Sequence, residues 1–478
     1  MLFNSFIFFL FLGVVLPIFF SLRTKTQKNT FLVLASYFFY GYWDWRFCGL
    51  LMISTLTDFV IGQAIHNSNR ERVRKMYLVV SLLVNLGILG FFKYFNFFAE
   101  SFQHAFRMFG AELDYLHLHI ILPVGISFYT FQTLSYSIDI YRRKIAPTRN
   151  LIDFALFVSF FPQLVAGPIE RAANLLPQLS RRLHPSREQT QKGVVLIVSG
   201  LFRKVMIGDA AGKYVDHIFG NVHLYRSDEL IFALVLFSVQ IYADFSGYSH
   251  MARGVAKLLG VEIIKNFEQP YLSANITEFW RRWHISLSSW LKDYLYLSLG
   301  GNRRGRLLTY RNLMVTMLLG GLWHGASWNF VVWGGLHGLY LALHKVLLRG
   351  RKPATGNRSP KTFAGWSRFL AGIVFTQMLV LITWLFFRSA SWDTTMLYLE
   401  QLIQFQTGEY TLQLLGIMAG FVSMVLLLDV LEYRSGKHTF MLQLANAPFR
   451  WGILAAAFGI TLVYMFISDP LPFIYFQF

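Results

Sequence analysis

The 478-residue sequence contains only one cysteine, Cys48, and few charged residues. A single cysteine excludes an internal disulfide and a cysteine-based metal cluster. Charged residues make up 14% of the chain, whereas soluble proteins carry about 25%. The histidines lack the spacing of metal-binding motifs such as H-E-x-x-H, so we predict no catalytic metal.

Hydrophobic residues, by contrast, make up 55% of the chain, and the mean hydropathy is +0.44. Apolar runs near or above the roughly 20 residues needed to cross a bilayer recur along the whole length. The sequence therefore predicts an all-α polytopic membrane protein. The first run has no basic residue before it and no A-x-A site, so we interpret it as an uncleaved span and not as a secretory signal.

The formal net charge of +19 could indicate a nucleic-acid partner. Lys and Arg also accumulate in the cytoplasmic loops of membrane proteins, and this interpretation is preferred because their positions give a consistent topology. We therefore predict no nucleic acid among the partners, and a lipid bilayer as the surroundings.

The basic residues predict the side on which each loop lies. Spans are expected at 5–21, 30–46, 49–65, 76–93, 117–140, 194–210, 229–247, 366–387, 411–430 and 451–467. The segment 151–167 contains Phe161-Pro162 and runs into Ala166-Gly167-Pro168, which predict a break in the helix, and it is expected to be re-entrant. The segment 312–344 is expected to form a hairpin, or a pair of broken helices, entered and left from the cytoplasm. This gives ten to twelve crossings with both termini on the periplasmic side.

We expect a single membrane domain with three regions. Residues 1–116 would form N-terminal helices, 117–346 a catalytic core, and 366–478 C-terminal helices followed by a periplasmic aromatic tail.

The first of two notable histidines, His284, lies in the stretch 275–296, where aromatic and apolar residues recur at helical spacing between polar ones. Such a pattern predicts a helix at the cytoplasmic interface with its aromatic side inward. His284 is expected within this helix, near the inward-facing aromatics. Interfacial histidines are commonplace, so a purely structural role stays open.

The second histidine, His324, lies in Gly-Gly-Leu-Trp-His-Gly-Ala-Ser-Trp-Asn, 320–329, inside the apolar hairpin. An imidazole without a partner is costly in hydrocarbon, and intramembrane ionisable residues usually face a cavity or a partner. The small neighbours Gly320, Gly321, Gly325 and Ala326 are expected to leave room beside the ring. The structural alternative is an imidazole bonded to a backbone carbonyl to fix helix packing.

Several long motifs carry a family resemblance, and they extend over essentially the whole chain: PVGISFYTFQTLSYSIDIYR (123–142), FPQLVAGPIER (161–171), QIYADFSGYS (240–249), and the stretches 266–303 and 317–338 that contain the two histidines. In these motifs the sequence resembles the membrane-bound O-acyltransferase family, and in particular the bacterial branch that includes alginate O-acetylation proteins. The resemblance implies helices arranged around a central tunnel, with an acyl thioester entering from the cytoplasm and a hydroxyl from the other side.

The resemblance also implies that His324 is the principal catalytic histidine and His284 the second histidine of the site. A histidine with its usual pKa can act as general base on a hydroxyl, and His284 would help to stabilise the oxyanion. Asp244, Gln240 and Asn329 are candidates to line the tunnel without a defined role; for Asp244 a packing or capping role is equally open.

Four arginines are candidates to hold the donor's phosphates at the cytoplasmic mouth: Arg281, Arg282, Arg303 and Arg304. Ordinary positive-inside charges are the alternative for them. The donor would be acetyl-coenzyme A or an acyl carrier thioester, and no tightly bound cofactor is expected.

The aromatic tail Pro-Phe-Ile-Tyr-Phe-Gln-Phe, 472–478, contains Tyr475 and no charged side chain. An extended chain of about eight residues spans roughly 25 Å, and the bilayer midplane lies about 15 Å below the hydrocarbon edge. Tyr475 can therefore reach a buried His324 from outside. The spacing of Phe473, Tyr475 and Phe478 is similar to a carboxy-terminal tyrosine motif of envelope-polymer acylation systems, which implies an acylated relay; an interfacial aromatic anchor is the alternative.

Together these features predict a bacterial inner-membrane O-acyltransferase that moves an acetyl group toward an extracytoplasmic polysaccharide. The resemblance implies a periplasmic or membrane-anchored SGNH-type acetyltransferase or esterase as partner. Peptidoglycan, teichoic acid or a small molecule are alternative acceptors. A transporter with an intramembrane proton-relay histidine and a non-catalytic assembly scaffold are alternatives from other classes.

Overall fold

The computed structural model describes residues 1–478 except 111–116, 165–166, 348–361, 445, 469–470 and 477–478. Every regular element among the described residues is a helix, which confirms the predicted all-α class. The chain forms two compact units, which are described one at a time. The first comprises Met1–Val194 and Ala252–Ile264, and the second Val195–Met251 and Lys265–Phe478.

The first unit is built from helices of different lengths. They are α1 (Phe6–Ser21), α2 (Lys25–Gly41), η1 (Trp45–Phe47), α3 (Cys48–Asn67), α4 (Glu71–Leu89), η2 (Gly90–Tyr94), α5 (Phe95–Met108), α6 (Ile126–Tyr141), α7 (Leu151–Ser159), α8 (Phe161–Leu164), α9 (Ala172–Leu179) and the first half of α10 (Arg187–Phe202).

A buried carboxylate joins three of these helices. Asp58 on α3 accepts hydrogen bonds from Ser81 (2.5 Å) and Asn85 (2.7 Å) on α4 and from Ser137 (2.6 Å) on α6. The three donors satisfy a polar group that would otherwise be costly inside an apolar bundle. They therefore fix the register of α3, α4 and α6.

Two expectations for this unit concern helix boundaries. The predicted helix at 117–140 begins only at Ile126, because Gly125 has a left-handed φ of 75° and Pro123 precedes it. The predicted break in 151–167 is confirmed: α7 ends at Ser159, Phe160 is non-helical, and α8 follows with Pro162 in its first turn. The re-entrant path of this segment stays a prediction.

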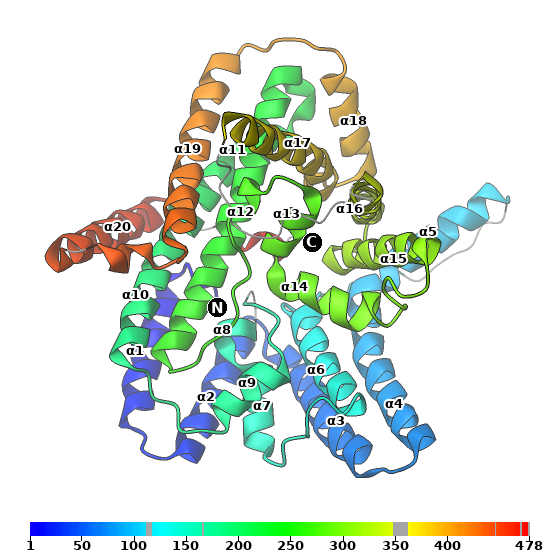
Figure 1. Cartoon of the computed structure of the whole chain (residues 1–478), viewed down its shortest axis with the longest axis vertical. Coiled ribbons are helices and arrows are strands. Elements are labelled where there is room, and N and C mark those ends of the chain that lie inside the picture. The colour runs from blue at the N-terminus through cyan, green and yellow to red at the C-terminus, as the bar shows by residue number, and fades with distance from the viewer. Residues whose placement is uncertain (111–116, 165–166, 348–361, 445, 469–470, 477–478) are drawn as a thin grey trace. The chain divides into compact units, whose positions relative to one another are not determined.

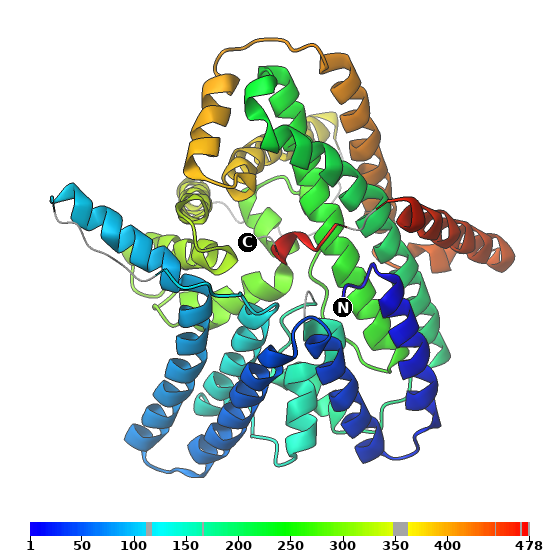
Figure 2. The ribbon, with the colours of Figure 1, turned by 180° about the vertical axis from the view of Figure 1, so that it is seen from behind.

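The second unit contains the remaining helices (Figures 1 and 2). They are η3 (Arg203–Asp209), α11 (Ala210–Gly220), η4 (Val222–Leu224), most of α12 (Ser227–Leu258), η5 (Pro270–Leu272), α13 (Ile276–Arg282), α14 (Ile285–Trp290), η6 (Leu291–Tyr296), α15 (Arg306–His324), α16 (Trp328–Leu347), α17 (Phe363–Arg388), α18 (Trp392–Leu402), α19 (Thr411–Ser435), η7 (Phe440–Gln443), α20 (Ala447–Ile467) and η8 (Ile474–Phe476).

Helices α15 and α16 form the predicted hairpin, with a turn at 325–327. Glycines let the two backbones approach closely. A Cβ on Gly321 would lie 2.1 Å from the carbonyl oxygen of Phe330, and one on Gly334 would lie 2.3 Å from that of Met317. Small residues at such an interface permit tight packing of membrane helices.

The expectation that Gly321 and Gly325 leave room beside His324 is wrong. A Cβ on Gly325 would lie 2.0 Å from the Phe330 ring, so Phe330 occupies the space beside both glycines. These positions are small because the turn of the hairpin is tightly packed, and not because a substrate needs the space.

Seven helices among the described residues are long and apolar enough to cross a membrane, which confirms a polytopic membrane protein. They are Trp45–Asn67, Glu71–Met108, Ser227–Leu258, Trp328–Leu347, Phe363–Arg388, Thr411–Ser435 and Ala447–Ile467. Ten to twelve crossings would require shorter apolar helices such as α1 to cross as well. That number stays a prediction, as do the three regions of the chain expected from the sequence.

Candidate active site

The stretch around His284 is not one continuous helix, so that expectation is wrong. Helix α13 ends at Arg282, and α14 begins only at Ile285. Between them His284 has left-handed backbone angles of φ 42° and ψ 57°, a conformation that non-glycine residues rarely adopt.

The neighbouring segment 266–268 explains the break. The N–H of Ile285 donates to the carbonyl oxygen of Asn266 (2.8 Å), and the N–H of Glu268 donates to that of Arg282 (3.0 Å). The Asn266 side chain accepts a further bond from the N–H of Ser286 (3.2 Å). These bonds replace helical ones, so the chain can turn at His284 without leaving its polar groups unsatisfied.

His284 is buried, with 1% of its surface exposed. Its ring packs edge-on against Phe245 of α12, with 4.7 Å between centroids, and lies 6.0 Å from the ring of Trp323. Burial lowers the pKa of His284 to about 3. The imidazole is therefore neutral at physiological pH and can donate one hydrogen bond and accept another.

His324 is the last residue of α15 and is 4% exposed. Its ring is surrounded by aromatic side chains: the centroid of Trp333 lies at 4.9 Å, that of Trp323 at 5.0 Å and that of Phe387 at 5.2 Å. Tyr475 from the tail lies on the ring as well, at 5.5 Å. Access to the imidazole therefore depends on aromatic rings, and one of them is Tyr475 of the tail.

The tail enters the second unit and ends beside both histidines. Figures 1 and 2 show the C-terminal segment in red running toward the middle of this unit. The Tyr475 ring lies 4.6 Å from that of Phe245 and 6.3 Å from that of His284. Its hydroxyl is buried and has no hydrogen-bond partner within the described part of the chain. Phe478, part of the predicted motif, lies outside the described residues.

The Tyr475 phenol is hard to ionise. Burial, helped by the neighbouring Tyr271 and Asp244, raises its pKa well above the usual value. A free phenolate is therefore disfavoured, and the hydroxyl can act as a nucleophile only if a base removes its proton during attack.

Asp244, a predicted tunnel-lining candidate, contacts the tail. Its Oδ2 accepts a hydrogen bond from the N–H of Ile474 at 2.8 Å. Its Oδ1 lies 2.8 Å from Nζ of Lys204, and this Nζ also lies 2.6 Å from Asp209 Oδ1 and 3.5 Å from the carbonyl oxygen of Pro472. The tail is thus held by its main chain as well as by its rings.

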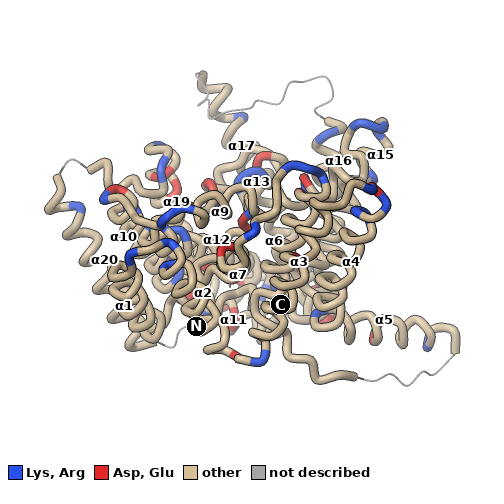
Figure 3. Tube along the Cα trace, turned by 90° about the horizontal axis from the view of Figure 1, so that it is seen from below, with Lys and Arg blue, Asp and Glu red and all other residues tan. Residues whose placement is uncertain are grey.

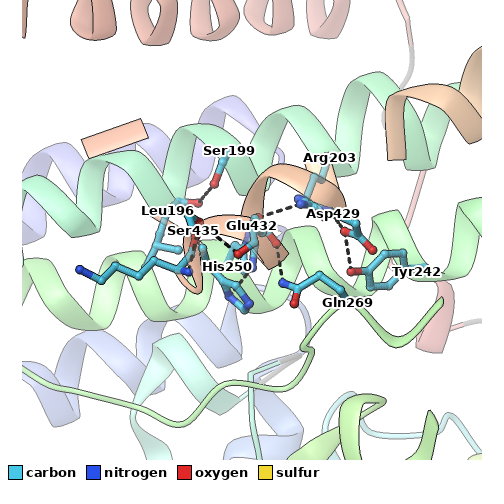
Figure 4. Close-up of polar contacts among 11 residues, drawn as sticks. Leu196, Ser199, Arg203, Tyr242, His250, Gln269, Asp429, Glu432 and Ser435 are labelled. Carbon is cyan, nitrogen blue, oxygen red and sulfur yellow. Dashed lines mark hydrogen bonds and ion pairs between the residues drawn. The ribbon is translucent and has the colours of Figure 1, made fainter. Parts of the chain in front are cut away.

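A second buried ionic network lies on the same helices (Figure 4). Arg203 pairs with Glu432 at 2.8 Å and lies 3.4 Å from Asp429. Asp429 accepts a bond from the Tyr242 hydroxyl (2.9 Å), and Glu432 accepts one from Gln269 (3.1 Å). This network connects η3, α12 and α19.

Lys204 and Arg203 were not predicted as site residues. The signal that could have found them is an Arg-Lys pair inside the apolar run 194–210, because an ionisable residue within such a run indicates a specific buried partner.

Gln240 and Asn329 pack against neighbouring elements. The Asn329 side chain donates to the carbonyl oxygens of Ser389 and Ser391 at 3.2 Å each, and so fixes the segment after α17. Gln240 lies against α11, where a Cβ on Gly212 would be 2.7 Å from its Nε2. A lining role for either residue stays a prediction.

The four arginines lie on two segments. Arg282 pairs with Glu278 at 2.7 Å and stacks on the ring of Tyr433, whereas Arg281 is exposed on the same short helix. Arg303 and Arg304 are exposed in the turn before α15. Their binding of donor phosphates stays a prediction.

Comparison with known proteins identifies the family. The model of the membrane-bound O-acyltransferase family matches residues 142–392, more than half of the chain, and this range includes both His284 and His324. The chain belongs to the membrane-bound O-acyltransferase family. It is therefore an enzyme, an O-acyltransferase, embedded in a membrane by several helices.

Individual relatives agree with this family. The chain is 41% identical over 416 residues to a probable alginate O-acetylase AlgI of Azotobacter vinelandii, covering 86% of this chain and 79% of the relative. A probable alginate O-acetylase AlgI of Pseudomonas putida is 42% identical over 391 residues, 81% of this chain and 77% of the relative. A peptidoglycan O-acetyltransferase of Helicobacter pylori is 34% identical over 434 residues, 84% and 80% respectively.

Proposed function

We propose that this O-acyltransferase moves an acetyl group from a cytoplasmic thioester, across the inner membrane, to a polysaccharide on the periplasmic side. The names of the relatives, alginate and peptidoglycan O-acetylating proteins, support an acetyl group and a polysaccharide acceptor. The observation that carries the proposal is the packing of the Tyr475 phenol against His324 and close to His284.

In the first step His324 is the general base and Tyr475 the nucleophile. His324 takes the proton from Oη of Tyr475 while Oη attacks the carbonyl carbon of the thioester. The C–S bond then breaks, and the thiolate takes the proton from His324 and leaves as a thiol. Tyr475 now holds the acetyl group as an ester. The rings are now at contact distance, and catalytic hydrogen bonds often tighten only when substrate is bound.

His284 suits the role of oxyanion donor. Because its imidazole is neutral, its N–H can donate a hydrogen bond to the developing negative charge on the carbonyl oxygen in a site from which water is excluded. The exposed arginines 281, 303 and 304, with Arg282, would hold the phosphates of acetyl-coenzyme A or of a carrier's phosphopantetheine.

The second step passes the acetyl group outward. A hydroxyl of a periplasmic or membrane-anchored SGNH-type partner attacks the tyrosyl ester, the bond to Oη breaks, and the proton of that hydroxyl returns to Oη. The partner would then acetylate the polymer. The relay lets a bulky polysaccharide react without entering the buried site.

Substitution at both reacting groups tests the proposal. His324→Ala should lower polymer O-acetylation by about a hundredfold or more, since general-base catalysis contributes about that much. Tyr475→Phe keeps the aromatic ring and should abolish the acetylated protein that mass spectrometry detects on wild-type Tyr475. Full polymer acetylation by Tyr475→Phe would eliminate the relay.

His337→Gln is the matched control for His324→Ala. His337 is an equally buried histidine of the same hairpin, but it is held by Trp280 (3.2 Å) and Thr383 (3.1 Å) and does not touch Tyr475. It should retain O-acetylation at equal expression. Normal acetylation by His324→Ala would instead favour a scaffold, and transport without an acyl-protein intermediate would favour a proton-relay transporter.

Peptidoglycan is the second candidate acceptor, favoured by the Helicobacter pylori relative. The two acceptors are distinguished by measuring ester-linked acetate in purified exopolysaccharide and in purified peptidoglycan from cells with and without active enzyme. The fraction that loses acetate identifies the acceptor.

A further inference from the structure

The C-terminal tail passes a buried ionic cluster before it reaches the two histidines. This cluster, which we call the tail clasp, consists of Lys204 and Asp209 on η3 and Asp244 on α12. All three side chains are at most 4% exposed. A buried charge needs partners with good geometry, and one of the partners here is the main chain of the tail.

The clasp contacts the tail at two backbone positions. Asp244 Oδ2 accepts the N–H of Ile474 at 2.8 Å, and Lys204 Nζ lies 3.5 Å from the carbonyl oxygen of Pro472. Hydrogen bonds to ionised groups are roughly twice as strong as those between neutral groups. The clasp therefore fixes the position of the tail along its own chain direction, and Tyr475 follows one residue after the bonded amide.

Glycines bring η3 close enough to α12 to form the clasp. A Cβ on Gly208 would lie 3.0 Å from the backbone nitrogen of Asp244, and one on Gly247 would lie 2.8 Å from that of Lys204. At this separation the Lys204 ammonium bridges the carboxylates of Asp209 and Asp244. The ammonium orients Asp244, whose second oxygen remains available for the amide of the tail.

Aromatic packing alone does not determine the register of the tail. Phe473 and Tyr475 both pack on Phe245, with ring centroids 5.4 and 4.6 Å away, so a tail displaced along its axis could still bury its rings. The bond from Ile474 to Asp244 is directional and distinguishes one register from the next.

We propose that Lys204 and Asp244 are positioning residues that dock the tail by its main chain and thereby place the Tyr475 hydroxyl at His324. This inference rests on the proposed relay for its catalytic meaning, but the docking itself can be measured without any reaction. Both residues would act through the backbone of the tail, which they contact at Ile474 and Pro472.

Carboxypeptidase digestion of the full-length protein in detergent tests the docking. Because the protease needs a free extended C-terminus, a docked tail should be trimmed only through transient opening. Intact mass spectrometry should show wild-type trimming that slows before Tyr475 is removed. Carboxypeptidase should remove Tyr475 from the Asp244→Leu variant at least about tenfold faster than from the wild type. The reason is that losing a hydrogen bond to a charged group shifts the equilibrium between docked and open tail by roughly that factor or more.

Two further variants separate docking from general damage. Asp244→Asn keeps an oxygen acceptor for the N–H of Ile474 and should restore part of the protection. Asp429→Asn alters an equally buried carboxylate that pairs with Arg203 and has no hydrogen bond or ion pair with the described residues of the tail. Its trimming rate should therefore stay close to that of the wild type at comparable thermal stability.

The outcomes keep the two proposals apart. Equal trimming of wild type, Asp244→Leu and Asp429→Asn would overturn the clasp, even if Tyr475 were found acetylated. Faster trimming confined to the Asp244 variants would support it, even if Tyr475 were never acetylated and the relay were wrong. If both hold, Asp244→Leu should also show less acetyl-Tyr475 than Asp429→Asn.

Discussion

His284 has an unusual backbone conformation and an unusually low pKa. Its left-handed conformation places the imidazole between Phe245 and Trp323, where the ring is removed from water. The same burial that lowers its pKa keeps it neutral. A neutral imidazole still carries one N–H, which can donate a hydrogen bond to an oxyanion.

The low pKa of His284 predicts how stability depends on pH. In the unfolded chain its pKa is near 6.5 and in the folded protein about 3, so between these values the unfolded state binds the extra proton and stability rises with pH. Acidification from pH 7 to pH 5 should therefore cost on the order of 2 kcal/mol from this group. Above pH 6.5 it should contribute no slope.

His284→Asn tests this dependence, because Asn tolerates the left-handed conformation and does not titrate. The thermal midpoint of the purified protein, measured from pH 5 to pH 7.5, should fall on acidification less for the variant than for the wild type. Parallel curves would show that folding leaves the pKa of His284 unchanged, which would contradict the burial of a neutral imidazole at this position.

At the scale of elements, the hairpin α15–α16 depends on glycines that differ sharply in their surroundings. A Cβ on Gly334 would lie 2.3 Å from the carbonyl oxygen of Met317, but one on the adjacent Gly335 would meet nothing closer than Leu318 Cδ2 at 3.6 Å. A methyl group should therefore be tolerated at Gly335 but not at Gly334.

Gly334→Ala should push the two helices apart and displace His324 at the end of α15, whereas Gly335→Ala should be close to neutral. We expect the first variant to lose about 1–3 kcal/mol of stability, as overpacked cores do, together with acyl transfer. Thermal unfolding and polymer acetylation of both variants check this. Equal behaviour of the pair would mean that the hairpin can relax around either methyl group.

The sequence predicted those elements that are determined by residues close together in the chain. The hairpin and the break near Phe160 follow from apolar runs and from Pro162, and both are present. The break at His284 was missed because its hydrogen bonds come from the segment 266–268, which no helical periodicity reveals. Tertiary partners of this kind override a regular pattern.

The residues of the candidate site likewise divide into those that the local sequence predicts and those that depend on distant parts of the chain. His324 was conspicuous as an ionisable residue in an apolar run, and the length of the tail allowed Tyr475 to reach it. Lys204 also stands in an apolar run, 194–210, but the carbonyl oxygen beside it belongs to Pro472, 268 residues further along the chain. Only the folded chain brings these two together.

At the scale of the whole molecule, the relay requires the tail to end on the periplasmic side. Within the hairpin, Lys and Arg gather where α15 begins and α16 ends (Figure 3), and basic ends of membrane helices face the cytoplasm. The segment 389–410 has acidic residues and no Lys or Arg, as an outer loop can. From there α19, with 25 residues, and α20, with 21 residues, are long enough to cross inward and outward again, since about 20 residues span the bilayer.

Single cysteines in a Cys48→Ser background test this path. The exposed positions are Gln404, in the segment before α19, Asn302, in the turn before α15, and Gln443, at the end of η7 before α20. A membrane-impermeant maleimide should label Gln404→Cys in intact spheroplasts, and the other two only after permeabilisation.

If Gln443→Cys were labelled in intact spheroplasts and Gln404→Cys were not, α20 would run inward and Tyr475 would lie on the cytoplasmic side. A tyrosine on that side could accept an acetyl group from the thioester but could not deliver it to a periplasmic polymer, so the second step of the relay would be excluded while the first remained possible.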